Sequence, residues 1–529
     1  MEVEIAPTVA LSRHNEKNQF YTFSMVQFKP PADHPRGATG AGRSIYELLR
    51  SQMADGTRPA DAAVPSTRSL AAELGVSRTT VTAAFEQLVA EGYLVTSAGR
   101  VARVAKPLAA AVPLHLPTQR NAPSESTLSD FGYRLQAMGM PALPQTEAVR
   151  FDFLYGAVAY RDFPTLAWRR AYKTELLSVQ QRLYYTAPEG DASLRVALQA
   201  YLRRARGLIC DAEQILVVHG SQQAIDLCAR LLLNADDAFV FEDPGYLMAR
   251  RCFEATGATC LAAPVDAQGL DTSRLPQDKN TRLVYVTPSH QFPLGGVLPI
   301  TRRQALLQWA RRQNAWVVED DYDGEFRYGQ RPIDALQSID GEGRVIYIGT
   351  FSKAMSPQLR LGYLVLPPEL VPVFRQAKRL TDRHAPVMEQ RVLASLIESG
   401  SYERHVRRMR RENERRRAAL LDAVGRYLPK DAQVGGTAAG LHVVLWLPFL
   451  SFKDETTLVA AARQAGVGIY PVSTLFAKDA PAVQPRPAGF ILGYASLTVA
   501  QIQQGLQIVG DLVAHWQGRF MPAIAPGSR

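Results

Sequence analysis

A lysine between small hydroxyl side chains is the residue of this sequence best suited to covalent chemistry. Lys353 ends the run Gly349-Thr350-Phe351-Ser352-Lys353, which follows an apolar, strand-like stretch. A desolvated lysine amine can form a Schiff base with an aldehyde. The hydroxyls of Thr350 and Ser352 can bind a phosphate on the same compound. An amine combined with phosphate contacts is what pyridoxal phosphate chemistry needs.

Carboxylates end a second apolar run, upstream of the lysine. Residues 316–318 lead into Glu319-Asp320-Asp321-Tyr322. This pattern predicts a buried parallel strand with acids at its carboxyl end, where open α/β sheets bind ligands. We expect Asp320 to hold a protonated pyridine nitrogen and Tyr322 to donate to the phenolic oxygen of the ring. The alternative is that these acids are simply solvated.

Phosphate contacts are predicted at two further places. Residues 215–218 form an apolar run that leads into Gly220-Ser221-Gln222 and then into a helical pattern. A strand, a glycine turn and a helix start present free backbone N–H groups and a positive dipole end to an anion. Arg360, seven residues after Lys353, offers a bidentate phosphate or carboxylate contact.

Taken together, these segments resemble fold-type I aminotransferases and, more closely, the aminotransferase-like half of MocR-type regulators, from about residue 151 to about residue 516. The resemblance rests on five ordered motifs, 185–190, 242–246, 287–293, 319–328 and 349–353. It implies that Lys353 carries pyridoxal phosphate, that Tyr246 packs on the cofactor ring and that Gln291 lies near its phenolic oxygen. It also implies that Tyr185 reaches the cofactor phosphate of a neighbouring subunit in a homodimer. The alternative is a decayed site that keeps the fold.

Residues 43–105 carry a different pattern. Ser44-Ile45-Tyr46-Glu47 has the form of a capping box that opens a helix ending near residue 56. Residues 65–75 predict a short capped helix that a glycine closes, and Ser77 is expected to cap a second helix over 78–88. Two short helices joined by such a turn are typical of a helix-turn-helix, whose second helix enters a major groove.

Two short apolar runs, 93–95 and 101–104, predict a two-stranded wing after these helices. The whole segment resembles the winged helix of the GntR family, although the wing tip 98–100 lacks the family's usual Gly-x-Gly turn. The resemblance implies contacts to double-stranded promoter DNA from six residues: Arg68, Ser77, Arg78, Thr79, Thr80 and Arg100. The alternative is a structural helix pair with no DNA function. Charge does not distinguish between these two alternatives. Residues 43–105 hold seven Lys or Arg against six Asp or Glu and are therefore almost neutral, in a chain of net charge +10.

The chain of 529 residues is long enough for two or three domains. We expect an α/β protein in which a winged helix-turn-helix is joined by a long linker to a fold-type I, pyridoxal phosphate-dependent aminotransferase-like domain. The expected divisions are a disordered extension (1–42), the winged helix (43–105), an extended Ala/Pro-rich linker (106–148), the aminotransferase-like domain (149–517) and a tail (518–529).

Other features exclude some classes of function. No stretch of 18 uninterrupted apolar residues predicts a membrane span, and no signal peptide is visible, so we expect a cytoplasmic protein. The four cysteines have no Cys-x-x-Cys spacing and are expected to be reduced core thiols, with no metal site. An arginine run over 404–417 could bind nucleic acid, but its interleaved glutamates favour a solvated helix face.

Two functions from different classes remain. The first is a transcriptional regulator that senses pyridoxal phosphate, or a small amine or amino-acid effector, through its aminotransferase-like domain. The second is a working aminotransferase with an accessory DNA-binding domain. Ile491 stands where the resemblance places the arginine that binds a substrate α-carboxylate. An isoleucine cannot form that bidentate pair, although Arg486 or Arg250 could replace it, so the sequence favours sensing.

Overall fold

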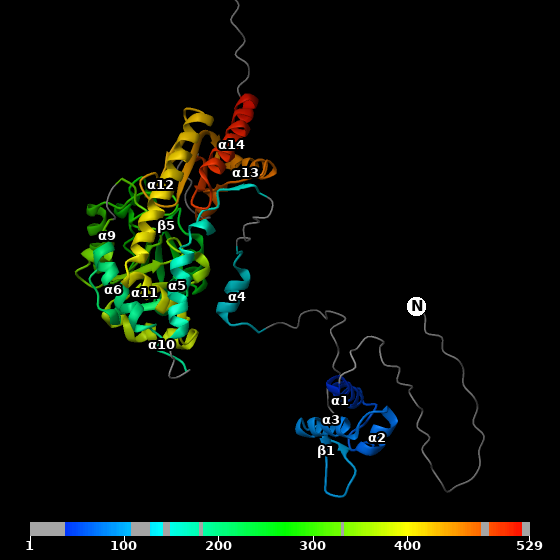
Figure 1. Cartoon of the computed structure of the whole chain (residues 1–529). Helices are drawn as coiled ribbons and strands as arrows, with labels where there is room; N and C mark the ends of the chain where they lie inside the picture. Colours follow the sequence, from blue (N-terminus) through cyan, green and yellow to red (C-terminus); the bar gives the residue numbers. More distant parts are fainter. Residues whose placement is uncertain are drawn as a thin grey trace, which may run out of the picture. The chain divides into compact units, whose positions relative to one another are not determined.

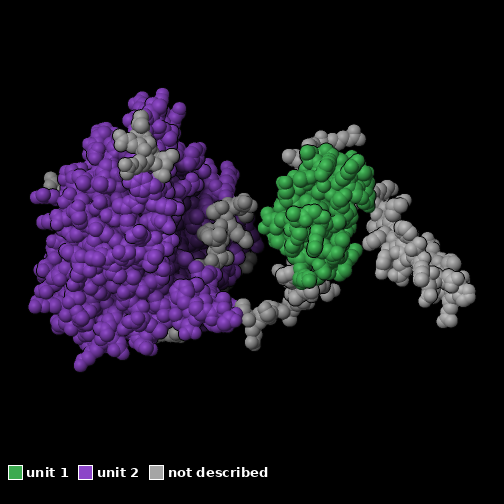
Figure 2. Space-filling model, turned by 90° about the horizontal axis from the view of Figure 1, so that it is seen from below, with its two compact units in different colours: residues 1–126 green, residues 127–529 purple. Residues whose placement is uncertain are grey.

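The chain forms two compact units, residues 1–126 and 127–529 (Figure 2). The computed structural model describes residues 38–106, 127–140, 149–178, 184–329, 333–477 and 486–520. Most of the predicted N-terminal extension and of the C-terminal tail therefore lies outside the described residues. Each unit has its own buried core.

Over residues 38–106, the first unit contains three helices and a two-stranded sheet (Figure 1). Its elements are α1 (Ala38–Ala54), α2 (Thr67–Leu74), α3 (Arg78–Ala90), β1 (Leu94–Val95) and β2 (Arg103–Val104). The two strands pair antiparallel, Leu94 opposite Val104, as expected for a wing. Val81 and Leu88 of α3 are fully buried in a core that all three helices and the sheet share.

The local signals of α2 and α3 are confirmed. The Ser66 hydroxyl accepts a hydrogen bond from the Ser69 N–H, and the Ser77 hydroxyl accepts one from the Thr80 N–H, each at 3.1 Å. Gly75 closes α2 with φ 64°, a backbone conformation that glycine adopts without steric cost. These caps fix the turn between the two helices.

The predicted start of α1 is wrong. The helix begins at Ala38, so Ser44 lies inside it instead of capping it. The Ser44 hydroxyl donates to the carbonyl of Gly40 at 3.0 Å. A serine inside a helix can satisfy its hydroxyl in this way. The spacing of Ser44 to Glu47 resembles a capping box but does not mark the start of this helix. Residues 38–42, which were expected to be disordered, are the first turn of this helix.

The second unit is built on an eight-stranded sheet, in the order β4-β11-β10-β9-β8-β5-β6-β7. The pairs formed by neighbours from β10 to β6 are parallel, and β11 and β7 join antiparallel. The strands are β4 (Ile215–Val218), β5 (Ala238–Asp243), β6 (Thr259–Asp266), β7 (Gly269–Leu270), β8 (Thr281–Val286), β9 (Trp316–Asp321), β10 (Val345–Thr350) and β11 (Gly362–Val365).

Helices cover both faces of this sheet, as the continuous apolar strands require. Along β4, Ile215 and Val217 face one core cluster, and Leu216 and Val218 face another. The helices are α5 (Thr165–Leu177), α6 (Ala192–Arg206), α7 (Gly220–Leu232), α8 (Leu247–Ala255), α9 (Ile300–Gln313), α10 (Val371–Thr381), α11 (Val387–Glu398) and α12 (Ser401–Tyr427).

A smaller antiparallel sheet follows, in the order β12-β13-β16-β15. Its strands are β12 (Gln433–Gly435), β13 (His442–Ser451), β15 (Tyr470–Pro471) and β16 (Pro487–Gly493), and α13 (Glu455–Gln464) and α14 (Val499–Phe520) pack with it. The strand that opens the unit, β3 (Phe151–Asp152), pairs in parallel with β14 (Val467–Gly468). The first and last parts of the unit thus share one core.

The segment predicted as an extended linker contains a helix, α4 (Asp130–Ala137). Ser129 caps it, and the Arg134 guanidinium donates to the Ala255 carbonyl at 2.8 Å. The cap stabilises the helix locally, and the hydrogen bond from Arg134 attaches it to the second unit, although the helix has no buried residue.

Among the described helices, none combines the length and apolarity of a membrane span.

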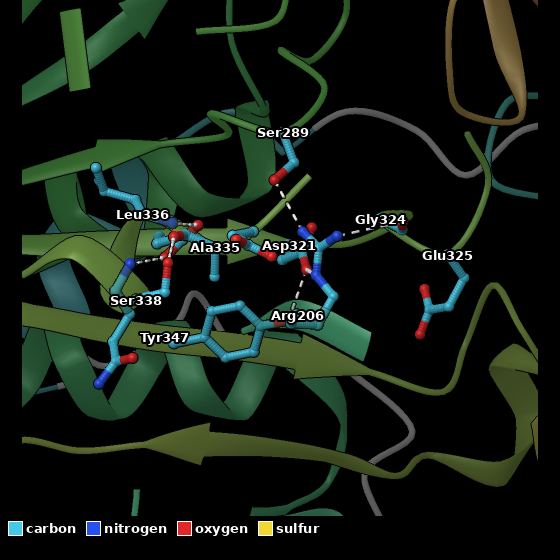
Figure 3. A network of polar contacts seen from close by, with 12 residues as sticks. Arg206, Ser289, Asp321, Gly324, Glu325, Ala335, Leu336, Ser338 and Tyr347 are labelled. Carbon is cyan, nitrogen blue, oxygen red and sulfur yellow. Dashed lines mark hydrogen bonds and ion pairs between the residues drawn. The ribbon is translucent and has the colours of Figure 1, made fainter. Parts of the chain in front are cut away.

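The end of β9 is held by a buried polar network (Figure 3). The Arg206 guanidinium lies 2.7 Å from the Asp321 carboxylate, and the Tyr347 hydroxyl donates to the same carboxylate at 2.6 Å. Arg206 also donates to the Ser289 hydroxyl at 2.9 Å. Burial alone would lower the pKa of Arg206, but the facing Asp321 raises it, so the guanidinium stays charged. The network joins α6 to two strands and to the loop after β8.

Breaking this pair is expected to cost much of the unit's stability. Arg206→Met leaves Asp321 buried without a cation, a change that typically costs about 3–5 kcal/mol. Arg204→Met, two residues away on α6, removes a half-exposed pair with Glu403 and should cost under about 1 kcal/mol. Urea unfolding followed by tryptophan fluorescence measures both. Equal losses in the two variants would contradict the role given to Arg206.

Candidate cofactor site and candidate DNA-binding surface

Asp320 is the carboxylate of β9 that faces a cavity. Side chains alternate along a strand, so Glu319 and Asp321 face the other side. The Tyr285 hydroxyl donates to Asp320 Oδ2 at 2.5 Å, whereas Asp320 Oδ1 is buried with no hydrogen-bond partner. Burial raises the pKa of Asp320 to about 7. The free oxygen can accept a hydrogen bond from a protonated ring nitrogen, which would favour the ionised carboxylate.

The acids at this strand end are not solvated, so that alternative is wrong. Glu319, Asp320 and Asp321 are 0%, 4% and 6% exposed. Glu319 accepts hydrogen bonds from the N–H groups of Leu336 and Gln337 at 2.7 and 2.9 Å. Burial raises the pKa of Glu319 to about 7. Protein groups therefore satisfy Glu319, and Arg206 neutralises Asp321, although Asp321 Oδ1 also has no hydrogen-bond partner. Of the three acids, Asp320 is the one that lines the cavity and is open to a ligand.

Lys353 lies in the turn after β10 and its amine enters the same cavity. Its Nζ donates to the Gly156 carbonyl at 3.0 Å. Gly156 has φ 84°, and a Cβ there would lie 2.8 Å from Nζ, so only glycine leaves room for the amine. Burial lowers the pKa of Lys353, although Asp323 and Asp320 oppose the shift. Burial therefore favours the neutral, nucleophilic form of the amine.

The predicted phosphate contacts come together at the start of α7. Ser221 and Gln222 occupy its first turn, and no side chain caps this helix. The Arg360 guanidinium donates to the His219 carbonyl at 2.9 Å, just before that turn. A Cβ on Gly220 would lie 2.9 Å from the same guanidinium, so the glycine allows Arg360 to approach the helix start. Free N–H groups and a guanidinium at one place suit a phosphate.

All of these groups line one cavity of about 430 Å³. Nine of the eleven predicted cofactor residues belong to its wall: Ser221, Gln222, Tyr246, Asp320, Tyr322, Thr350, Ser352, Lys353 and Arg360. They come from the ends of β9 and β10, the start of α7, the turn before α8 and the segment after β10. A parallel sheet places these ends at one edge, as the strand pattern predicted.

Gln291 and Tyr185 lie outside the wall of this cavity. The Gln291 amide is buried and donates to the carbonyls of Pro244 and Phe292 at 2.9 and 2.6 Å. Its local role in this structure is to hold the loop after β8. Tyr185 is 63% exposed, with the Arg383 guanidinium 4.2 Å from its ring centroid. An exposed tyrosine remains available to a second subunit, which the structure does not contain.

The sequence did not single out several residues of the wall. Tyr155 and Gly156 come from the loop after β3, and His442 comes from β13 of the small sheet. These positions had no local signal, because only the tertiary fold brings the two sheets together. Asp323 also lines the cavity. Its place in the 319–328 motif was a usable signal.

Asp323 belongs to a buried polar cluster with His290, His442 and Tyr322. His290 Nδ1 lies 3.0 Å from Asp323 Oδ2 and 2.9 Å from the Tyr322 hydroxyl. His442 Nε2 donates to the Pro293 carbonyl at 2.9 Å, and burial lowers the pKa of His442 to about 4. Candidate ligand atoms of the two histidines and Asp323 lie within 4.8 Å of one another. His290 Nε2 is buried without a hydrogen-bond partner. The sequence, which predicted no metal site, did not identify this group of possible ligands.

The site has the groups that pyridoxal phosphate requires. Asp320 Oδ1 is an unpartnered buried acceptor for the ring nitrogen, and Lys353 is an amine in the same cavity. Tyr246 supplies an aromatic wall, packed edge-on against Phe292 with ring centroids 5.8 Å apart. Arg360 and the start of α7 supply phosphate contacts. The donor set therefore fits the cofactor that the sequence predicts.

The candidate DNA-binding surface is the start of α3 in the first unit. Arg68, Arg78, Thr79 and Arg100 are exposed, as phosphate or base contacts must be. Ser77 is different, because its hydroxyl lies 2.7 Å from both the Thr79 and Thr80 hydroxyls and also caps the helix. Its side chain is engaged in forming the helix start, so a contact from Ser77 would have to share that hydroxyl.

The arginine run 404–417 lies on α12 and is only partly solvated. Arg416 is 1% exposed and lies 2.7 Å from the Asp162 carboxylate. Arg410 donates to the Glu325 carbonyl at 2.9 Å, and Arg417 packs over the Tyr328 ring. These three arginines hold α12 against the rest of the unit. Arg404, Arg407, Arg408, Arg411 and Arg415 are exposed, as expected of a solvated helix face.

Comparison with known families divides the chain in the same way. The family described as aminotransferase class I and II matches residues 155–477. The family described as bacterial regulatory proteins, gntR family, matches residues 41–104. The two matches fall on the second and the first unit, respectively.

Relatives of known name share both units. A probable rhizopine catabolism regulatory protein, MocR, of Rhizobium meliloti is 35% identical over 88% of this chain and 92% of its own. The pyridoxine biosynthesis transcriptional regulator PdxR of Corynebacterium glutamicum is 32% identical over 85% of this chain and 92% of its own.

A solved structure resembles the second unit. It is the α-aminoadipate aminotransferase LysN of Thermus thermophilus, complexed with N-(5'-phosphopyridoxyl)-L-leucine. It is 29% identical, with a TM-score of 0.63 over 70% of this chain and 94% of that one. The large sheet and its helices are therefore those of an aminotransferase-like domain.

Proposed function

The chain belongs to the MocR type of the GntR family of bacterial regulators, and on this premise we propose that it is a transcriptional regulator that senses pyridoxal phosphate or an amino compound. One observation carries the proposal most directly. The unpartnered Asp320 oxygen and the Lys353 amine line one cavity, in a chain that also carries an exposed helix-turn-helix.

Most of the predicted cofactor residues lie in this wall, and each has an expected role toward pyridoxal phosphate. Bound pyridoxal phosphate supplies an aldehyde that condenses with amines and a ring that accepts electrons. Lys353 would hold it covalently, and Asp320 would keep its ring nitrogen protonated. Tyr246 would pack on the ring, and Tyr322 and Gln291 would lie near its phenolic oxygen. Ser221, Gln222, Thr350, Ser352 and Arg360 would bind the phosphate.

The apolar surroundings of Ile491, where the substrate-binding arginine of aminotransferases is expected, favour sensing over aminotransferase activity. Ile491 is 0% exposed and lies in an apolar cluster with Val444 and Val472. Neither candidate substitute lines the cavity: Arg486 stacks 3.8 Å from the Phe476 ring centroid, and Arg250 donates to the carbonyls of Leu475 and Phe476. Among the described residues of this chain, no guanidinium is left to orient a substrate carboxylate beside Lys353.

We further propose a cytoplasmic homodimer formed through the second unit. Tyr185 is exposed and lies outside its own subunit's cavity, so it can complete a phosphate site only in a neighbour. Two winged helices would then bind two DNA half-sites. Light scattering at micromolar concentration tests this arrangement, and a monomer that binds the cofactor normally would contradict it.

Lys353 is expected to be the residue that borohydride reduction labels. Reduction of the cofactor-loaded protein should leave a pyridoxyl group on Lys353, because this amine lines the cavity beside Asp320. Lys353→Ala should abolish the label, and Lys453→Ala, at an exposed lysine, should not. Peptide mapping by mass spectrometry identifies the site. A label on another lysine in the unaltered protein would exclude Lys353.

Arg78 is expected to contact promoter DNA directly. Arg78→Ala should weaken specific binding by roughly 1–3 kcal/mol, because an exposed arginine at the start of this helix reaches base edges. Arg43→Ala removes an exposed arginine paired with Glu47 on α1 and serves as the control. Both variants should load cofactor normally. Fluorescence anisotropy with a promoter fragment measures affinity, and equal affinities for the two variants would show that α3 docks differently.

Turnover of common α-amino acids is expected to be very slow or to stop at half-reactions. Without a carboxylate clamp the substrate is not held in a reactive alignment, which normally supplies several kcal/mol of catalysis. A steady-state keto-acid assay with saturating pyridoxal phosphate measures the rate. A rate on the order of 1–1000 per second would support the aminotransferase alternative instead.

A further inference from the structure

Part of the cavity wall is not among the predicted cofactor contacts. Besides the predicted cofactor residues, its wall includes Tyr155, Phe292, Asp323, Leu441 and His442. Tyr155, Phe292 and Leu441 are predominantly apolar. Asp323 and His442 are 2% and 4% exposed and are the polar members of this group. If a ligand places its amino group at Lys353, the rest of the ligand would contact these side chains.

The charges of the cavity wall do not suit a carboxylate. Its cations are Lys353, which is the site of covalent attachment, and Arg360, which is tied to the start of α7. His442 adds no charge, because burial lowers its pKa to about 4. Its Nε2 donates to the Pro293 carbonyl, which leaves Nδ1 as an acceptor. A carboxylate here would lie desolvated beside Asp323, and the one guanidinium of the described cavity wall, Arg360, is already engaged at the start of α7.

The same charges suit a hydrogen-bond donor. Asp323 is held by His290 at 3.0 Å, so its carboxylate is fixed in position. A buried carboxylate that lines a cavity attracts a second ammonium or a hydroxyl of a ligand. His442 Nδ1 can accept another hydrogen bond. The apolar residues leave space for the short carbon chain between the two polar ends.

We propose that the effector is a small primary amine without a carboxylate, bearing a second ammonium or hydroxyl that Asp323 binds. This inference rests on the proposed function, since it concerns the ligand of the same cavity. Asp323 is a specificity-determining residue in this proposal. The α-amino acid that differs from such an amine only by a carboxylate should bind more weakly, because that carboxylate would be desolvated near Asp323.

Matched ligand pairs test the proposal. Calorimetric titration of the full-length, cofactor-loaded protein would compare 1,4-diaminobutane with ornithine and ethanolamine with serine. Each pair differs by one carboxylate. The decarboxylated member of at least one pair should bind at least about tenfold more tightly, since a desolvated, unpaired carboxylate is costly. Equal or tighter binding of both amino acids, or no binding of any of the four compounds, would overturn the proposal.

A variant isolates the role of Asp323. Asp323→Asn keeps the shape and an acceptor for His290 but removes the charge. It should weaken 1,4-diaminobutane about tenfold and leave butylamine, which lacks the second ammonium, unchanged. Asp266→Asn, at a surface pair with Arg302, is the matched control. Equal effects on both amines would exclude Asp323 as the contact. Absence of the cofactor's visible absorption before titration would instead reject the proposed function itself.

Discussion

Three consecutive carboxylates at the end of one buried strand set the main constraint on the second unit. Burying an ionised carboxylate is costly unless cations or hydrogen-bond donors compensate it. Glu319 receives two backbone N–H groups, and Asp321 receives Arg206 and Tyr347. Asp320 receives Tyr285 on one oxygen and nothing on the other. Asp321 Oδ1 also has no hydrogen-bond partner, but Asp320 is the one of these three acids that lines the cavity. The free oxygen of Asp320 is therefore the acceptor that a ligand can reach.

Much of this arrangement could be predicted from the sequence, because the signals were local. Ser66, Ser77 and Gly75 identify the ends of α2 and α3, and apolar runs followed by acids or glycine identify β4, β9 and β10. Parallel strands place their carboxyl ends at one edge of a sheet, so residues far apart in sequence could be expected to meet.

Prediction failed where a local signal was ambiguous or where long-range contacts decided the outcome. The Ser44 spacing to Glu47 resembled a cap, but the helix had already begun at Ala38. Helix α4 depends on Arg134 and a carbonyl 121 residues away. Gly156 and His442 enter the cavity only because the two sheets of the unit pack together. Gln291 had the expected motif, yet its amide lies among backbone carbonyls, which no single-sequence pattern specifies.

The pairing of β3 with β14 has a consequence for synthesis of the chain. Phe151 and Asp152 form the first described strand of the second unit, but their partners Val467 and Gly468 are synthesised much later. The described core of the first unit lies within residues 45–104. Domains generally fold as units, N-terminal first, during translation. In a nascent chain the recognition helix would therefore fold well before the cofactor cavity forms. The chain could then bind DNA before it could bind a metabolite.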